Sequence, residues 1–196
     1  MVIEADQRES VGVKGNARLT GSSGALIFVL LAAEGVTILR VQQLISAHVF
    51  IGMLLVPIVV LKLGTTGYRF SRYYRGDPAY VRKGPPPVLL RLLGPIVVVL
   101  TAAVLATGIA AIAAGPSNRW IVTAHKASFI LWFGAMTVHV LGHILETPAL
   151  AVADLQPQTR REASGAGARI AVLVLTVALG VSLATLSLGW VGAWGR

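Results

Sequence analysis

The sequence contains no cysteine, and this absence excludes several kinds of site. Disulfides, thiolate-bound iron–sulfur clusters, cysteine zinc sites and covalently attached c-type haem all require that side chain. Charge is also scarce, because charged residues make up 13% of the chain, against about 25% in a typical soluble domain. Hydrophobic residues make up 55%, and the mean hydropathy is +0.75. A globule of 196 residues could not bury that much apolar surface, which excludes an ordinary soluble enzyme, and disorder requires low hydrophobicity.

Five apolar segments are present, and each is close to or longer than the roughly 20 residues that a helix needs to cross a membrane. They cover 24–40, 42–63, 87–114, 119–145 and 168–192. We therefore predict an all-α integral-membrane helical bundle with five transmembrane helices. The first segment follows a polar leader that is not clearly basic, so we interpret it as a span rather than a signal peptide.

The segments divide the chain into four parts: a polar leader (1–23), a four-helix haem-binding core (24–146), a linker (147–167), and a fifth helix with a short tail (168–196). The fifth helix is expected at the periphery of the bundle. Its small residues Ala178 and Ser182, one turn apart, are expected to pack against a neighbouring helix.

Basic residues predict the orientation. Thirteen Lys or Arg residues fall in the leader, in 62–91 and in 146–169, whereas four fall on the other side. Because cytoplasmic loops carry the excess, we predict a multi-pass protein of the cytoplasmic (inner) membrane, with its N-terminus inside and its C-terminus outside. The net charge of +9 then reflects topology, and nucleic acid is not expected as a partner. The basic and aromatic stretch 68–75 is expected to contact lipid headgroups, or alternatively a cytoplasmic protein.

All four histidines lie within apolar spans, where ionisable residues indicate a functional role by default. His48 and His125 are each about six residues from the outer end of helices that run in the same direction, which places both imidazoles at a similar depth. Two neutral imidazoles at one depth are the axial ligands that a haem iron takes. We therefore predict a haem b between them; polar packing contacts and another metal remain the alternatives.

The other two histidines, His139 and His143, follow His125 by 14 and 18 residues. At 100° per residue these spacings are 40° short of four turns and five whole turns, so all three share one face of the helix. The inner pair is interpreted as ligands of a second haem, as a quinone site, as an i, i+4 metal pair, or as ordinary interhelical hydrogen bonding.

Three further residues lie within the same spans. Gly52, one turn after His48, is expected to leave space for a cofactor ring. Lys62 is expected to neutralise a haem propionate or to extend to the headgroups. Glu34 is expected to pair with Arg40 or extend to the surface, or to accept a proton during quinol oxidation beside the outer haem.

Two stretches resemble the diheme b-type cytochromes, including the membrane subunits of hydrogenases and formate dehydrogenases: HKASFILWFGAMTVHVLGH (125–143) and SAHVFIGMLLVPIVVLKL (46–63). The resemblance covers the first four spans, and it implies a haem near each membrane face. The chain departs from the family at position 62, 14 residues after His48, where a lysine stands. The resemblance therefore supports the outer haem and leaves the inner one open.

These features predict a membrane b-type cytochrome that passes electrons between an extracytoplasmic redox partner and the quinone pool through His48 and His125. Nucleotide-binding and flavin-binding patterns are missing from the sequence, so we expect an electron-transfer subunit of an oxidoreductase rather than a complete enzyme. Homo-oligomerisation stays open. The alternatives are a cofactor-free membrane scaffold or accessory subunit, and a metal or proton transporter that uses the His125, His139 and His143 face.

Overall fold

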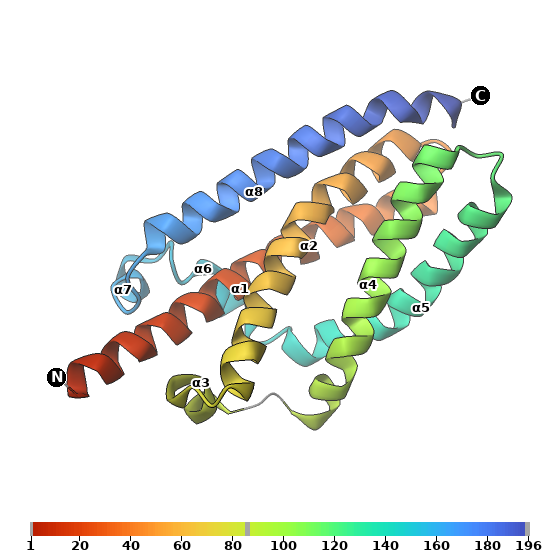
Figure 1. The fold of residues 1–196 in the computed structure, drawn as a ribbon. Coiled ribbons are helices and arrows are strands. Elements are labelled where there is room, and N and C mark those ends of the chain that lie inside the picture. The colour runs from red at the N-terminus through yellow and green to blue at the C-terminus, as the bar shows by residue number, and fades with distance from the viewer. Residues whose placement is uncertain (1, 85–86, 195–196) are drawn as a thin grey trace.

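The secondary structure is helical throughout the described part of the chain. The computed structural model describes residues 2–84 and 87–194, and positions 195–196 of the predicted tail lie outside it. The elements are α1 (Val2–Leu39), α2 (Ile45–Tyr74), α3 (Pro78–Lys83), α4 (Val88–Ala114), α5 (Arg119–His143), α6 (Thr147–Val152), α7 (Pro157–Arg160), α8 (Ala166–Ser187) and the 3-10 helix η1 (Leu188–Ala193) (Figure 1). Five helices in this part are long and apolar enough to cross a membrane, which confirms the predicted all-α fold and the number of spans.

Two helices continue beyond their predicted apolar segments. The leader and the first span form one helix of 38 residues, α1, whose candidate span begins at Val11. Helix α2 has 30 residues and extends to Tyr74, so most of the basic and aromatic stretch 68–75 is helical. Proline is missing from both continuations, so the helices do not stop where the sequence turns polar. At 1.5 Å per residue α2 is about 45 Å long, and it therefore outreaches a hydrocarbon core of about 30 Å.

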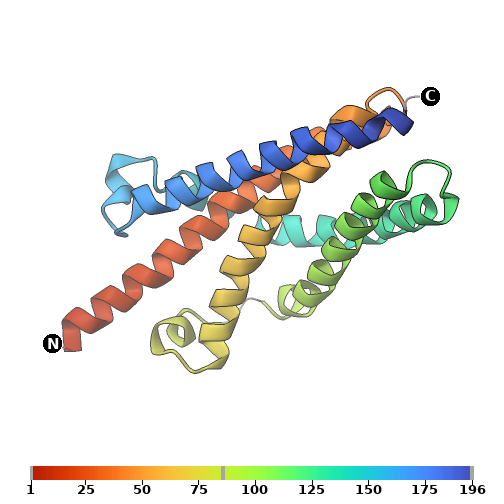
Figure 2. The same ribbon diagram turned by 45° about the horizontal axis from the view of Figure 1, so that its top comes forward.

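The long helices alternate in direction and form two hairpins. Helices α1 and α2 pack along one another, as do α4 and α5, and α8 lies along α2. The α1–α2 turn, the α4–α5 turn and the C-terminal end of the described chain lie at one end, whereas the N-terminal end, α3 and α7 lie toward the other (Figure 1). Figure 2 shows the α4–α5 hairpin standing away from α1, α2 and α8. The candidate site lies between the two hairpins.

Helix α8 approaches α2 through small residues, but not through the predicted pair. A Cβ atom at Gly180 would lie 2.7 Å from Leu54 Cδ1 and 2.8 Å from the Leu54 carbonyl oxygen, so this contact requires glycine. Ala184, one turn later, is fully buried. Ala178 and Ser182 are exposed, so the prediction that they pack against a neighbour is wrong about the face of the helix.

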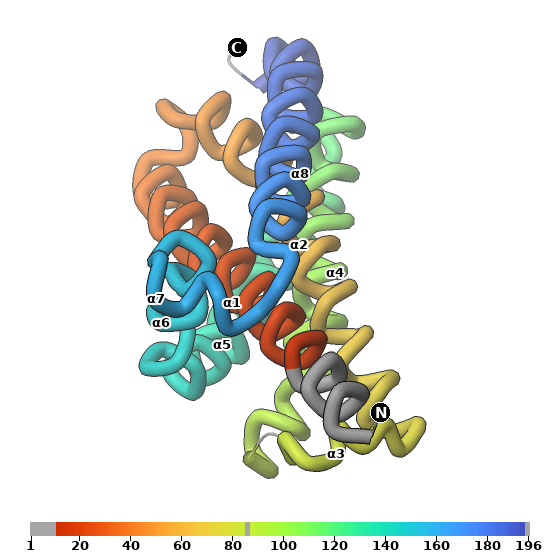
Figure 3. The backbone as a smooth tube through the Cα atoms, turned by 90° about the vertical axis from the view of Figure 1, so that its left-hand side faces the viewer, coloured from red at the N-terminus to blue at the C-terminus, as the bar shows by residue number. Residues whose placement is uncertain are grey.

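The linker between α5 and α8 is tied to α1 by a buried ion cluster, which we call the linker clamp: Arg18, Asp154 and Arg169. Arg169 donates to both carboxylate oxygens of Asp154, at 2.5 and 2.7 Å, and Arg18 donates to one of them at 3.1 Å. The hydrogen bonds from Arg169, with those from Arg18, lower the pKa of Asp154 below its usual value. Figure 3 shows α6 and α7 beside α1, where the clamp connects them.

Candidate functional site: a histidine pair between two hairpins

Two imidazoles from different hairpins face one another near the end of the bundle that carries the α1–α2 turn. His48 lies in the first turn of α2, and His125 lies in the second turn of α5. Their ring centres are 6.3 Å apart, and the ring planes are inclined by 68°. A metal bond of about 2.0–2.1 Å on each side, with about 1.1 Å from each nitrogen to its ring centre, gives about 6.3 Å. The spacing therefore fits one metal ion held between the two rings.

The His48 ring is held through its Nδ1 atom by two residues of α1. Glu34 Oε1 lies 2.9 Å from this nitrogen, and the Thr37 hydroxyl lies 3.2 Å from it. The Thr37 hydroxyl is also 3.1 Å from the other carboxylate oxygen of Glu34. Because a carboxylate accepts hydrogen bonds, the His48 ring carries its proton on Nδ1 and keeps Nε2 for a ligand.

The His125 ring is held in the same manner by neutral groups of α4. Its Nδ1 atom is 3.1 Å from the Val104 carbonyl oxygen and 3.2 Å from the Thr107 hydroxyl. A Cβ atom at Gly108 would lie 3.0 Å from His125 Cε1, so the missing side chain lets the ring rest on α4. Among the described residues no hydrogen bond reaches Nε2 of either histidine. Anchoring one ring nitrogen while the other stays free is how proteins orient metal-binding imidazoles.

The histidine pair opens into a cavity of about 1830 Å³ between the hairpins. Small-molecule sites are typically about 300–1,000 Å³, so this cavity has room for a group larger than most ligands. Its wall is mainly apolar, and the Trp132 indole N–H that faces it donates to the Thr101 hydroxyl at 2.9 Å. Gly52 lines the cavity beside the histidine pair; a Cβ there would approach only Glu34 Oε1, at 3.6 Å. The position therefore leaves space next to the His48 ring, as the sequence predicts.

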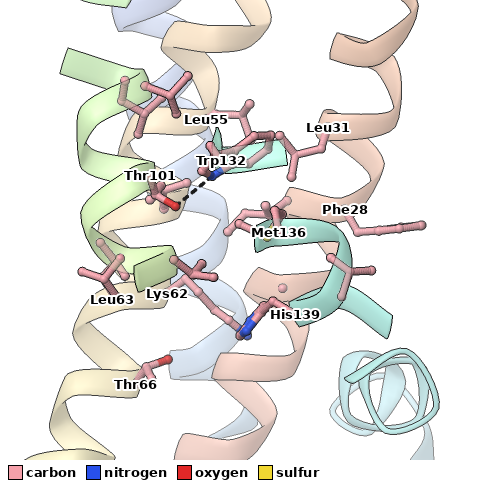
Figure 4. Close-up of a pocket in the computed structure, with 18 of the residues that line it drawn as sticks. Phe28, Leu31, Leu55, Lys62, Leu63, Thr66, Thr101, Trp132, Met136 and His139 are labelled. Atoms are coloured by element: carbon pink, nitrogen blue, oxygen red, sulfur yellow. Dashed lines mark hydrogen bonds between the residues drawn. The ribbon is translucent and has the colours of Figure 1, made fainter. Parts of the chain in front are cut away.

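The other two histidines line the same cavity farther along α5. The His139 and His143 ring centres are 4.9 Å apart, and His139 Nδ1 is buried without a hydrogen-bond partner. Lys62 and His139 point toward one another across the cavity (Figure 4). The Lys62 ammonium also donates to the Thr20 carbonyl oxygen at 2.8 Å, so it turns toward α1 and the cavity rather than toward lipid headgroups. The inner histidines thus face a lysine and not another imidazole.

No protein-family model, curated protein or solved structure matches this chain. The likeness to b-type cytochromes is therefore one of histidine spacing, and function must be argued from the site. Within the described residues no three His, Asp or Glu side chains gather as a metal-ion site. The donor set does fit a haem, because its iron needs only two axial ligands from the protein.

Sequence reasoning missed the partners that hold the two rings. Glu34 was expected at the depth of His48, but its carboxylate contacts His48 and Thr37 rather than Arg40. Its depth was a usable signal, since both residues lie near the same turn. Thr107 carried no signal, because sequence spacing within one helix does not say which neighbouring helix a side chain meets.

Proposed function

We propose that this chain is a membrane b-type cytochrome, an electron-transfer subunit that holds a haem b between His48 and His125. The observation that carries the proposal is the pair of imidazoles from separate hairpins, 6.3 Å apart, each anchored through Nδ1. Glu34 and the α4 backbone orient the ligands, and the apolar cavity wall excludes water from them. The haem supplies one-electron chemistry when bound.

The direction of electron flow follows from the predicted topology. The segments rich in Lys and Arg lie toward one end of the bundle in Figure 1, and this grouping supports placing that end in the cytoplasm. His48 and His125 lie toward the opposite end, on the outer side of the cytoplasmic membrane. Exchange with an extracytoplasmic redox partner then needs the shortest electron path.

The inner end of the cavity supports a quinone as the second redox group. His139 Nδ1 has no hydrogen-bond partner, and Lys62 has two N–H donors beyond the one given to Thr20. Both point into an apolar space, which suits the hydrogen-bond acceptors and flat ring of a quinone. A second bis-imidazole haem has less support, because Lys62 stands where its other ligand would be.

The test is a dithionite-reduced minus oxidised spectrum of the purified protein, with a pyridine haemochrome assay for haem per chain. We expect sharp bis-imidazole bands and one haem per chain. His48→Ala and His125→Ala should each abolish the low-spin spectrum, because each removes one axial ligand. His143→Ala, the same substitution on the same helix as His125, should leave it intact.

The competing functions give different outcomes. A cofactor-free scaffold gives a colourless protein even after haem supplementation during expression, and that result would reject the proposal. Two haems per chain would contradict the quinone assignment and would make Lys62 the first candidate for the missing ligand. A transporter that uses the His125, His139 and His143 face would lose transport in all three alanine variants, whatever their spectra.

A further inference from the structure

We propose that Glu34 is a positioning residue for His48 and that its carboxylate makes the two axial ligands unequal, which lowers the reduction potential of the bound haem. This inference rests on the proposed haem between His48 and His125. It goes beyond that proposal because it assigns a role to a charged residue of α1, the helix that contributes no ligand.

The contact is close and enclosed. Glu34 Oε1 lies 2.9 Å from His48 Nδ1, and the two side chains are 13% and 20% exposed. The Thr37 hydroxyl bridges them, at 3.1 Å from Glu34 Oε2 and 3.2 Å from His48 Nδ1. Thr37 is itself buried. The carboxylate therefore has a fixed place beside the ring rather than the freedom of a surface side chain.

The second ligand lacks such a partner. His125 Nδ1 faces the Val104 carbonyl oxygen at 3.1 Å and the Thr107 hydroxyl at 3.2 Å, and both groups are neutral. A hydrogen bond to an ionised acceptor is roughly twice as strong as one between neutral groups. The Glu34 contact thus makes His48 the more basic, more electron-donating ligand.

The charge of Glu34 acts on the iron in the same direction as the hydrogen bond. Ferric haem carries one more positive charge than ferrous haem, so a nearby carboxylate favours the ferric state. The side chains are mostly shielded from solvent, and the cavity beside them is apolar, so water screens this interaction less than at a surface. Replacing Glu34 by a neutral residue of the same shape should therefore raise the reduction potential.

The test is a potentiometric titration of the haem-loaded full chain at one fixed pH, for the wild type and Glu34→Gln. We expect the reduction equilibrium of Glu34→Gln to shift at least tenfold toward the ferrous state, which is about 59 mV for one electron. Haem content should stay at the wild-type level. Thr107→Val is the matched control, because it removes a neutral partner from the other ligand; it should shift the equilibrium less than threefold.

A shift below threefold in Glu34→Gln, with haem content retained, overturns the inference and leaves Glu34 a structural link between α1 and α2. If Glu34→Gln binds no haem, Glu34→Ala is measured in the same titration, with the same tenfold expectation. Loss of haem from both variants, with helicity retained, also overturns a tuning role. A wild-type protein without bis-imidazole bands would instead reject the proposed function, so the two failures are distinguishable.

Discussion

The linker clamp offers a test of the fold that does not depend on any cofactor. In Asp154→Ala the guanidinium groups of Arg18 and Arg169 lose the anion that they share. The side chains of the three residues are only 5 to 11% exposed, so both charges would stay buried without it. Breaking a buried ion pair by removing one partner costs about 3–5 kcal/mol.

The lower end of this range applies here, because both guanidinium groups keep other acceptors. Arg18 still donates to the Thr159 carbonyl oxygen at 2.8 Å, and Arg169 donates to the Ser164 carbonyl oxygen at 2.6 Å. We expect the free energy of local opening of the linker to fall by about 3 kcal/mol, which is roughly a 100-fold change in the opening equilibrium. The spans should keep their helicity, since their cores lie elsewhere.

Limited trypsin digestion measures this opening at specific bonds. Arg160 and Arg161 lie in the linker and are exposed, and cleavage after them requires the local chain to unfold. Asp154→Ala should raise the rate of cleavage there by about 100-fold. Asp77→Ala is the control, because it removes a carboxylate from a pair with Arg72, whose side chain is 46% exposed. A wild-type cleavage rate in Asp154→Ala would refute the clamp.

Three further outcomes are expected. Gly108→Val places a side chain 3.0 Å or less from His125 Cε1, so it should displace the ring and remove most of the bound haem, measured by the haemochrome assay. Gly180→Leu collides with Leu54 and should cost about 1–3 kcal/mol, seen as a lower Tm in detergent, whereas Gly189→Leu, with open space around it, should not. Because hydrogen bonds lower the pKa of Asp154, its stabilising contribution is present above about pH 4 and is lost as the pH falls through the lowered value. Hydrogen exchange of the linker amides, corrected for intrinsic rates, should accelerate only below that pH.

Depth in the membrane was predictable, whereas the direction of side chains between helices was not. Counting residues from the helix ends placed His48 and His125 at one level, and their rings do lie together. The same counting could not say that Glu34 turns toward His48, because that depends on how α1 is rotated against α2. It also placed the small-residue contact of α8 on the face of Ala178, when Gly180 makes it.

The way the hairpins meet gives the histidine pair a structural consequence. Helices α1, α2 and α8 pack closely together, and α4 packs closely on α5, but α2 and α4 contact one another over only a short stretch. Membrane helices gain little from the hydrophobic effect within lipid, so a short contact holds the two groups weakly. A haem bonded to His48 on one hairpin and to His125 on the other would tie them directly. Because a ligand that binds only the folded state stabilises it, the separation of the hairpins should depend on haem binding far more than the packing of α8 on α2 does.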